Sequence, residues 1–363
     1  MKINLPRGSA YRLTPVLMGG IPAAATWAPG QKIRITCGAW NRDTVRAISP
    51  SSRSAYLSRM HENPTSARDP EFDLNSALSR FAPEVRLHPD DLHHPASVPW
   101  FLERTRLRRW RGLLRPDDDL LPVGRVTAGR LADLSAQEIA QSVGSPTNLY
   151  LDIPGGPRER DVRRGFRPAS GRISAPCYVN ARAAPDDPEA FDIQYWFFHA
   201  FNGREGWHVT HEGDWEHVTI RVSNDAEPKL KWAYISAHGL ASGGWAEPAS
   251  DSYTGPELRL TSSGRPVIYS ALGSHASYRG PGAYSRGRFK SRDRTADGGP
   301  VWDTAADLVL VEVNGKRPAG DAHRWLDFPG HWGAIRKLAW PFAASGPLGP
   351  SHQTPWRAEP AKG

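Results

Sequence analysis

Six short runs of β-branched and aromatic residues in the second half of the chain constrain its fold more than any other feature. Turn residues such as Asn-Gly, Asn-Asp and Ser-Gly separate these runs, as they do between the strands of all-β domains. We therefore expect a mainly β protein, an antiparallel β-sandwich with long irregular loops and few short helices. The runs are PCYVNARA (176–183), FDIQYWFF (191–198), WEHVTIRV (215–222), LKWAYISAHG (230–239), RPVIYSALGSH (265–275) and DLVLVEV (307–313).

Composition supports a loop-rich β fold. The 363 residues include 34 glycines, 33 prolines and 14 tryptophans, a mixture that disfavours helix bundles. A chain of this length can bury a core without covalent staples. The two cysteines, Cys37 and Cys177, are too few for a disulfide framework or a thiolate zinc site. A single bridge between them and two free thiols both stay open.

The sequence predicts one folded domain after an extension. Residues 1–70 are rich in Arg, Ser and Pro and lack hydrophobic periodicity, so we expect a basic, partly disordered N-terminal extension. Residues 71–363 are expected to form a single β-sandwich domain. Helical spacing predicts a short helix over Leu74–Phe81, and a second helix should begin near Ser97, a good N-cap. The charged segment 107–125 is interpreted as a loop.

The C-terminal region shows little regular pattern. We expect an ordered but irregular tail that wraps the sandwich. Three tryptophans are expected to hold this tail in place: Trp332, Trp340 and Trp356.

The net charge permits several anionic partners and selects none. Lys plus Arg number 46 and Asp plus Glu 38, an excess of 8 that is spread along the chain. Because the basic residues do not cluster on one element, nucleic acid is a poor candidate partner. No apolar run is long enough to span a bilayer. The N-terminus loosely imitates a secretory signal, although Pro15 and Pro22 interrupt its apolar stretch. A secreted or peripheral membrane location is slightly favoured over a cytoplasmic one.

The segment HEGDWEH (211–217) concentrates acids and histidines at the start of a strand. In a strand, Asp214 and Glu216 would share the inward face with the valine and isoleucine that follow. Unpaired carboxylates there would be costly, and His211 in the preceding turn can fold over them. Oxygen and imidazole ligands suit a divalent cation, with Mg²⁺ or Ca²⁺ favoured and Mn²⁺ or Zn²⁺ as alternatives. The competing interpretation pairs the carboxylates with an arginine such as Arg221 or Arg279.

Other side chains are candidates for neighbouring roles. His238 and His275 follow predicted strands beside a glycine, where they can turn over the rim of a sandwich. They are the candidate catalytic bases if the protein is a hydrolase. The histidine- and acid-rich stretch LHPDDLHH (87–94) is interpreted as a surface turn. Tryptophans in glycine-rich or polar loops are predicted to form an exposed ligand-binding surface: Trp207, Trp245 and Trp302.

A series of motifs in order resembles the vacuolar protein sorting-associated protein sixty-two family of fungi, plants and bacteria. The resemblance covers roughly residues 76–356. The molecular activity of that family is poorly defined, and its fungal name implies a role in protein delivery to the vacuole. The motifs are RFAPEVRLHPDDLHHPASVPWFL, IQYWFFHAFN, HEGDWEHVTIRV, SAHG, RPVIYSALGSHASY, GHWG and GPLGP followed by a tryptophan.

The central motif is also similar to the necrosis- and ethylene-inducing peptide-like cytolysins. Their hallmark is the heptapeptide GHRHDWE, and THEGDWE (210–216) stands in its place here. The resemblance implies a β-sandwich with a divalent cation at one end, near glycosylated sphingolipid headgroups. It implies the cation ligands His211, Asp214 and Glu216, with Asn202 or Glu205 at the position of an upstream acid. Gly213 replaces the second histidine of the heptapeptide.

Three functions follow from these features. The first is divalent-cation-dependent binding of glycan or lipid headgroups at a membrane surface, toxin-like or related to trafficking. The second is a metal-dependent hydrolase that uses a cation-activated water, with His238 or His275 as the base. The third is a structural trafficking module whose cation only locks the end of a strand. No nucleophile motif is present, so we rank binding above hydrolysis.

Overall fold

The structure is a computed structural model that describes residues 72–141, 148–155, 173–203, 210–237, 244–247, 258–285, 292–335, 345–353 and 356, with the backbone alone for 138–141. Several predictions lie outside the described residues. They concern the extension over 1–70, and the residues Cys37, Glu205, Trp207, His238 and Trp340.

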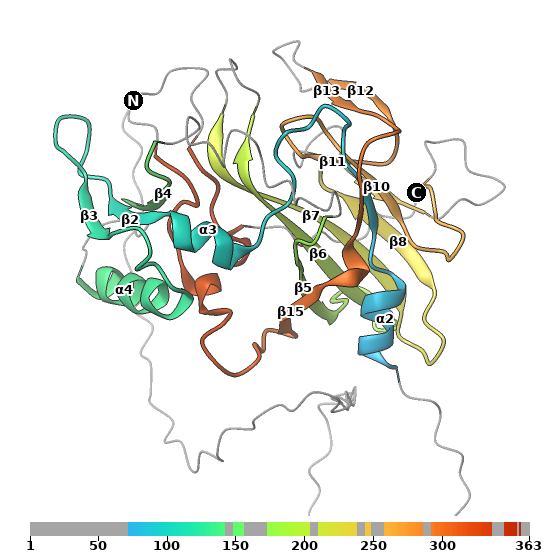
Figure 1. Ribbon diagram of the computed structural model, residues 1–363. Coiled ribbons are helices and arrows are strands. Elements are labelled where there is room, and N and C mark those ends of the chain that lie inside the picture. The colour runs from blue at the N-terminus through green and yellow to red at the C-terminus, as the bar shows by residue number, and fades with distance from the viewer. Residues whose placement is uncertain are drawn as a thin grey trace, which may run out of the picture. The chain divides into compact units, whose positions relative to one another are not determined.

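A six-stranded sheet in the order β15-β5-β6-β7-β8-β9 lies at the centre of the domain (Figure 1). Neighbouring strands are antiparallel except for β15 and β5, which are parallel. Five of the six predicted runs form strands of this sheet, so the mainly β fold is confirmed. The strands are β5 (Cys177–Ala183), β6 (Ala190–Asn202), β7 (His211–Ser223), β8 (Leu230–Ile235), β9 (Gly244–Ala246) and β15 (Leu308–Val313).

Smaller sheets accompany the central one. The sixth predicted run forms β10 (Val267–Ser270) in a four-stranded sheet of order β11-β10-β1-β14. Its other strands are β1 (Glu84–Arg86), β11 (Ser277–Tyr278) and β14 (Val301–Asp303). A three-stranded sheet of order β3-β2-β4 contains β2 (Arg106–Arg109), β3 (Asp118–Leu121) and β4 (Leu149–Asp152). The pair β12 (Gly282–Ser285) and β13 (Arg292–Thr295) completes the described sheets.

The described α-helices are α2 (Leu74–Arg80), α3 (Val98–Arg104) and α4 (Ala128–Gln141), and the 3₁₀ helices are η6 (Thr304–Ala306), η7 (Arg324–Asp327) and η8 (Pro350–His352). The two predicted helices are confirmed as α2 and α3. The Ser97 hydroxyl caps α3 by accepting the backbone N–H of Trp100 at 3.2 Å. In the part of the chain that the structure describes, no helix is long and apolar enough to cross a membrane.

The cap supplies a direct test of the local fold. Replacing Ser97 with alanine should lower the free energy of unfolding by about 1 kcal/mol, because an N–H of the first turn of α3 loses its acceptor. Replacing Ser97 with aspartate, which also caps, should restore most of the stability. Urea unfolding of the three proteins checks this result, and equal midpoints for Ser97→Ala and wild type would contradict it.

Both faces of the central sheet are buried, and every residue of β6 is buried. On one face, Tyr195, Phe197 and Val218 pack toward α2, β1 and β14. On the other face, Trp196 and Trp215 pack toward α3, the three-stranded sheet and η7. These elements lie on opposite sides of the sheet (Figure 1). The alternation predicted for β7 is confirmed, and it directs Asp214 to the same face as Val218.

One local prediction was wrong, and one helix was missed. The segment 107–125 contains β3 and most of β2 rather than a continuous loop. Cross-strand ion pairs join these strands: Arg108 Nε lies 2.7 Å from Asp119 Oδ1, and Arg109 lies 3.4 Å from Asp118. Such strands lack the alternation of apolar and polar residues, so an analysis of hydrophobic periodicity does not predict them. The helix α4 was not predicted.

The tryptophans of the C-terminal half divide between core and surface. Trp302 is 1% exposed on β14, and its indole N–H donates to the Ala175 carbonyl at 3.3 Å. Its place in an exposed ligand-binding surface was therefore a wrong prediction, because the ring fills the core beside Phe197. Trp332 is buried, whereas Trp356 lies 4.0 Å below the Arg182 guanidinium.

Candidate functional site

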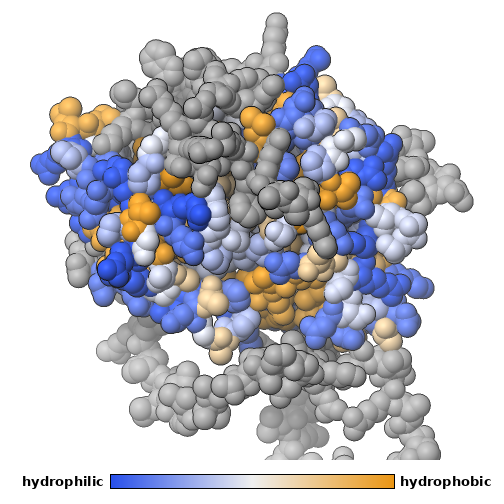
Figure 2. Space-filling view, viewed as in Figure 1, coloured by the Kyte–Doolittle hydropathy of each residue, from blue (hydrophilic) through white to orange (hydrophobic). Residues whose placement is uncertain are grey.

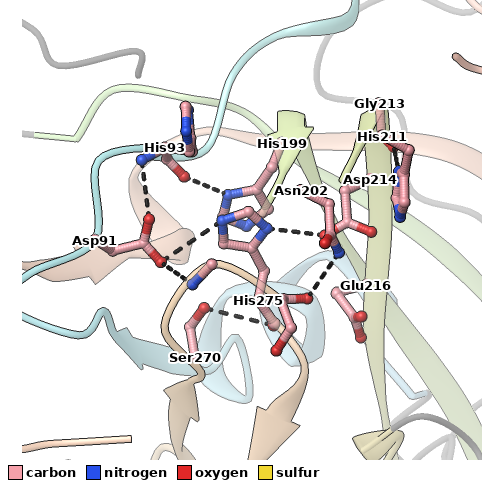
Figure 3. A network of polar contacts seen from close by, with 12 residues as sticks. Asp91, His93, His199, Asn202, His211, Gly213, Asp214, Glu216, Ser270 and His275 are labelled. Atoms are coloured by element: carbon pink, nitrogen blue, oxygen red, sulfur yellow. Dashed lines mark hydrogen bonds and ion pairs between the residues drawn. The ribbon is translucent and has the colours of Figure 1, made fainter. Parts of the chain in front are cut away.

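A buried histidine lies between two carboxylates at the end of the central sheet (Figure 3). The Nδ1–H of His275 donates to Asp214 Oδ2 at 2.8 Å. The other ring nitrogen, Nε2, lies 3.6 Å from Asp91 Oδ2. All three side chains are almost fully buried, so water screens these charges weakly. We call Asp91, His275 and Asp214 the carboxylate–histidine network.

Strands and turns from distant parts of the sequence position this network. Asp214 lies on β7, and the Asn202 amide at the end of β6 donates to its Oδ2 at 3.1 Å. Asp91 lies in the loop between β1 and α3, where its Oδ2 accepts the backbone N–H of Gly273 at 3.0 Å. His275 itself has φ of 55°, a left-handed conformation that costs energy outside glycine. The turn between β10 and β11 therefore holds His275 in place.

The surroundings keep His275 protonated. Burial alone would lower its pKa, but Asp91 and Asp214 outweigh burial and raise that pKa to about 10. Burial raises the pKa of Asp91 and of Asp214, and the imidazolium of His275 outweighs this and holds both below their ordinary values. The network is thus carboxylate, imidazolium, carboxylate at neutral pH. His275 cannot serve as a general base while it carries this proton.

A second histidine stacks on the first. The rings of His199 and His275 are 3.7 Å apart and tilted by only 6°. The Nδ1 of His199 lies 2.9 Å from the carbonyl of His93, to which it donates. Burial first, and then the positive His275, lower the pKa of His199 to about 3. His199 is therefore a neutral ring that packs against the charged ring of His275. The sequence analysis missed His199 because nothing in its strand distinguishes it from the other buried residues of β6.

The three predicted cation ligands have separate partners. His211 donates its Nδ1–H to the carbonyl of Gly213 at 2.8 Å. Glu216 accepts the hydroxyl of Ser236 at 3.2 Å. Among the described residues no group of three or more His, Cys, Asp or Glu side chains is arranged to hold a metal ion. The groups that face Asp214 are N–H donors, and N–H donors cannot coordinate a divalent cation. The arrangement therefore does not fit a divalent cation, and a cation at this site stays a prediction.

The two arginines that the sequence offered as competing partners have other contacts, and Arg279 donates to the carbonyl of Trp245 at 3.4 Å. Arg221 is fully buried and pairs with Asp192 at 2.7 Å and with Asp186 at 2.8 Å. Trp245 packs against the same arginine, whose guanidinium lies 5.2 Å from the indole. Among the described residues, the charged group that pairs with Asp214 is the imidazolium of His275. The second carboxylate beside His275 is Asp91, which lies in the stretch LHPDDLHH. That stretch was therefore the sequence signal for this partner.

A small hollow opens beside the network. Its volume is about 190 Å³, and its lining includes both carboxylates of the stretch read as a surface turn, Asp90 and Asp91. The stretch is only partly a surface turn, since Asp91 and His93 are buried while Asp90 and Leu92 are exposed. The remaining lining residues are Leu92, His93, Gly203, Leu272 and Gly273. The hollow thus combines two carboxylates, two glycines and two leucines.

Fold and site define a mainly β protein with a charged network at the end of its central sheet. Residues 57–337 match the family described as vacuolar protein sorting-associated protein 62, and the chain belongs to that family. The predicted resemblance is thereby confirmed.

Two relatives from Saccharomyces cerevisiae illustrate the similarity. A putative vacuolar protein sorting-associated protein, TDA6, is 30% identical over 72% of this chain and 60% of its own length. Vacuolar protein sorting-associated protein 62 is 26% identical over 81% of this chain and 66% of its own length. The chain therefore spans less than two thirds of either relative.

Solved structures that match this chain include Necrosis and Ethylene inducing Protein 2 from the causal agent of cocoa's Witches Broom disease, with a TM-score of 0.31 and 15% identity, over 70% of this chain and 81% of that one. The non-toxic HaNLP3 protein matches with a TM-score of 0.32 and 13% identity, over 73% of this chain and 86% of that one. NLPPya in complex with mannosamine matches with a TM-score of 0.29 and 14% identity, over 69% and 77%. Similarity at this level carries no conclusion about activity.

Proposed function

We propose that this chain binds glycan or lipid headgroups at a membrane surface, and that the hollow beside Asp91 receives a headgroup that carries an amine. The observation that carries the proposal is the pair of carboxylates in the lining of a hollow of about 190 Å³. Pockets for drug-sized ligands measure roughly 300–1,000 Å³, so a single sugar ring or a small headgroup suits this hollow better.

The charge of the hollow favours a cationic ligand. The network contains two carboxylates and one imidazolium, which leaves a net negative charge at its wall. Asp90 adds an exposed carboxylate at the rim. A ligand ammonium group or hydroxyl can contact the exposed Asp90 carboxylate, and the buried Asp91 adds its negative charge to the wall. Amino sugars and ethanolamine-type lipid headgroups share this chemistry.

Glycine and leucine residues fit the same kind of ligand. A side chain on Gly203 would lie 2.3 Å from Thr210 Cγ2, and its φ of 130° also disfavours other residues. Gly273 has φ of 72°, so it too favours glycine at a backbone position that lines the hollow. Leu92 and Leu272 offer apolar contacts to the carbon face of a sugar ring.

Calorimetric titration tests the proposal without any membrane. Glucosamine and phosphoethanolamine should bind about tenfold more tightly than glucose, in the presence of a chelator, because only they carry an amine. Replacing Asp90 with asparagine should weaken their binding several-fold. The matched control is Asp225→Asn, which neutralises an exposed acid outside the hollow.

Each outcome of the titration is decisive. Equal affinities for glucose and glucosamine, or no binding of any of these compounds, would overturn the amine-headgroup proposal. Binding that appears only when Mg²⁺ or Ca²⁺ replaces the chelator would instead support the cation site predicted at His211, Asp214 and Glu216. In that case Asp214→Asn should abolish the cation-dependent part.

A further inference from the structure

The turn between β2 and β3 exposes two adjacent leucines. Leu113 is 58% exposed and Leu114 is 97% exposed. The turn projects at the left of Figure 1, and an apolar patch with hydrophilic residues below it lies at the same place in Figure 2. Single exposed leucines are common on protein surfaces, but two adjacent ones at the end of a projecting hairpin form a local apolar surface. We call Leu113 and Leu114 the hairpin tip.

The hairpin holds this tip away from the core. Below the tip, Asp117 accepts the Tyr150 hydroxyl at 2.6 Å and the backbone N–H of Arg111 at 3.2 Å. The ladder then continues through the Arg108–Asp119 and Arg109–Asp118 pairs. A well-supported hairpin cannot fold its leucines back without breaking these contacts. The exposure is therefore built into the fold.

Charge is arranged around the leucines in a definite order. Arg111 and Arg115 flank them, and Arg115 is exposed. The three acids of the hairpin follow further along the chain, and each of them has a hydrogen-bond or ion-pair partner. Those partners are Tyr150 for Asp117, Arg109 and Arg111 for Asp118, and Arg106 and Arg108 for Asp119. The end of the hairpin thus combines apolar side chains with two arginines.

We propose that this hairpin tip inserts Leu113 and Leu114 into the boundary region of an anionic lipid bilayer, with Arg111 and Arg115 against the lipid phosphates. Leucine side chains gain free energy by leaving water for the acyl region, and arginines gain from an anionic surface. A protein partner fits less well. Two leucines offer much less than the roughly 800 Å² per partner of a stable protein interface.

The proposal rests on the proposed function only for its membrane setting. It names the surface that meets the bilayer, and it does not need the hollow beside Asp91. Vesicles of phosphatidylcholine and phosphatidylglycerol contain no primary amine. Choline is a cation, so vesicles of pure phosphatidylcholine are the control for binding at the hollow. Binding that requires phosphatidylglycerol reports on the hairpin and not on the amine-headgroup site, so the two proposals fail separately.

Flotation of the full chain with vesicles is the central experiment. We expect binding to vesicles that contain phosphatidylglycerol and weak binding to pure phosphatidylcholine. Leu113→Ser combined with Leu114→Ser should reduce the bound fraction on anionic vesicles by tenfold or more. The matched control, Val123→Ser with Leu260→Ser, replaces two other exposed apolar residues and should bind like wild type.

The arginines are tested in the same assay. Arg111→Gln with Arg115→Gln should weaken binding to anionic vesicles several-fold and make the remaining binding less sensitive to salt. Insertion itself is measured with a polarity-sensitive dye on Leu114→Cys, in a Cys37→Ser background, because Cys177 is buried. The dye should report an apolar environment only on anionic vesicles.

Three results would overturn the proposal. Wild type that does not float with anionic vesicles would do so, and so would a leucine double variant that floats like wild type. The third is a leucine double variant that changes the mass of the protein in analytical ultracentrifugation while vesicle binding is unchanged. That result would assign the tip to contact between copies of the chain.

Discussion

Replacing His275 with glutamine should lower the free energy of unfolding by about 3–5 kcal/mol, because it leaves two buried carboxylates without their shared cation. Glutamine can still donate one hydrogen bond but carries no charge. Asp214 would retain the Asn202 amide, and Asp91 would retain backbone N–H groups. These neutral donors cannot replace an imidazolium in a medium of low polarity. Urea unfolding at pH 7 measures the loss.

The control for this variant is His211→Gln. His211 is partly exposed and donates to a backbone carbonyl of its own strand, β7, so its replacement should cost less than about 1.5 kcal/mol. A second test adds Asp91→Asn to His275→Gln, which removes one uncompensated charge. The double variant should lose less stability than the two single variants together. Additive losses, or a loss below about 1 kcal/mol for His275→Gln, would show that the network is not ionic.

The dependence of stability on pH gives an independent signature. The pKa of His275 is raised in the folded protein to about 10, so its contribution is complete below the unfolded value of roughly 6.5 and disappears as the pH rises to about 10. The lowered pKa values of Asp91 and Asp214 act in the opposite sense, and their contributions disappear only in acid. The pKa of His199 is lowered to about 3, so its contribution is lost as the pH falls below roughly 6.5. His275→Gln should therefore abolish the alkaline decline of wild type.

Replacing Gly213 with alanine should cost about 2–5 kcal/mol. Its φ of 59° is left-handed, which adds about 1–2 kcal/mol for a residue with a Cβ. A Cβ would also lie only 1.9 Å from the carbonyl oxygen of Trp332, and relieving such a contact adds about 1–3 kcal/mol. Thermal or urea unfolding measures the sum.

Gly315 provides the matched control for the backbone term. It has a similar φ of 73°, but a Cβ there would have nothing within 4 Å. Gly315→Ala should therefore cost only about 1–2 kcal/mol, and the difference between the two variants isolates the clash with Trp332. If both alanines cost the same, close packing does not explain the glycine at 213. The contact also shows why a histidine does not fit this position of the heptapeptide.

Much of the fold could be predicted because the central strands carry their signal locally. β5, β6 and β7 are rich in β-branched and aromatic residues, and turn residues lie between the predicted runs. The hairpin of β2 and β3 lacked this signal. Strand β2 (RLRR) carries arginines and strand β3 (DDLL) carries acids, and their pairing becomes visible only when the two strands lie side by side. Local periodicity cannot report a stabilisation that comes from cross-strand charge.

The candidate site could be predicted in part. Asp214 and His275 were found because each stands at the end of a predicted strand, and they do contact each other at 2.8 Å. Their partner Asp91 is 123 residues from Asp214 in sequence, since 214 − 91 = 123. Its loop had the composition of a surface turn, and only tertiary packing buries it. Either a buried imidazolium or a bound metal cation can neutralise the Asp214 carboxylate, so the residue types alone could not distinguish a histidine partner from a metal site.

The complete burial of β6 has a consequence for how the site can move. Amide hydrogens in a strand covered on both faces exchange with solvent only when the whole domain opens, whereas those of surface loops exchange through local fluctuations. His199 and Asn202 belong to β6, and Asp214 belongs to the paired strand β7. Asp91 and His275 come from the loop before α3 and the turn after β10. The side of the site formed by β6 and β7 should therefore open only when the whole domain unfolds. Hydrogen–deuterium exchange should detect local opening only in the loop that contains Asp91 and in the turn that contains His275.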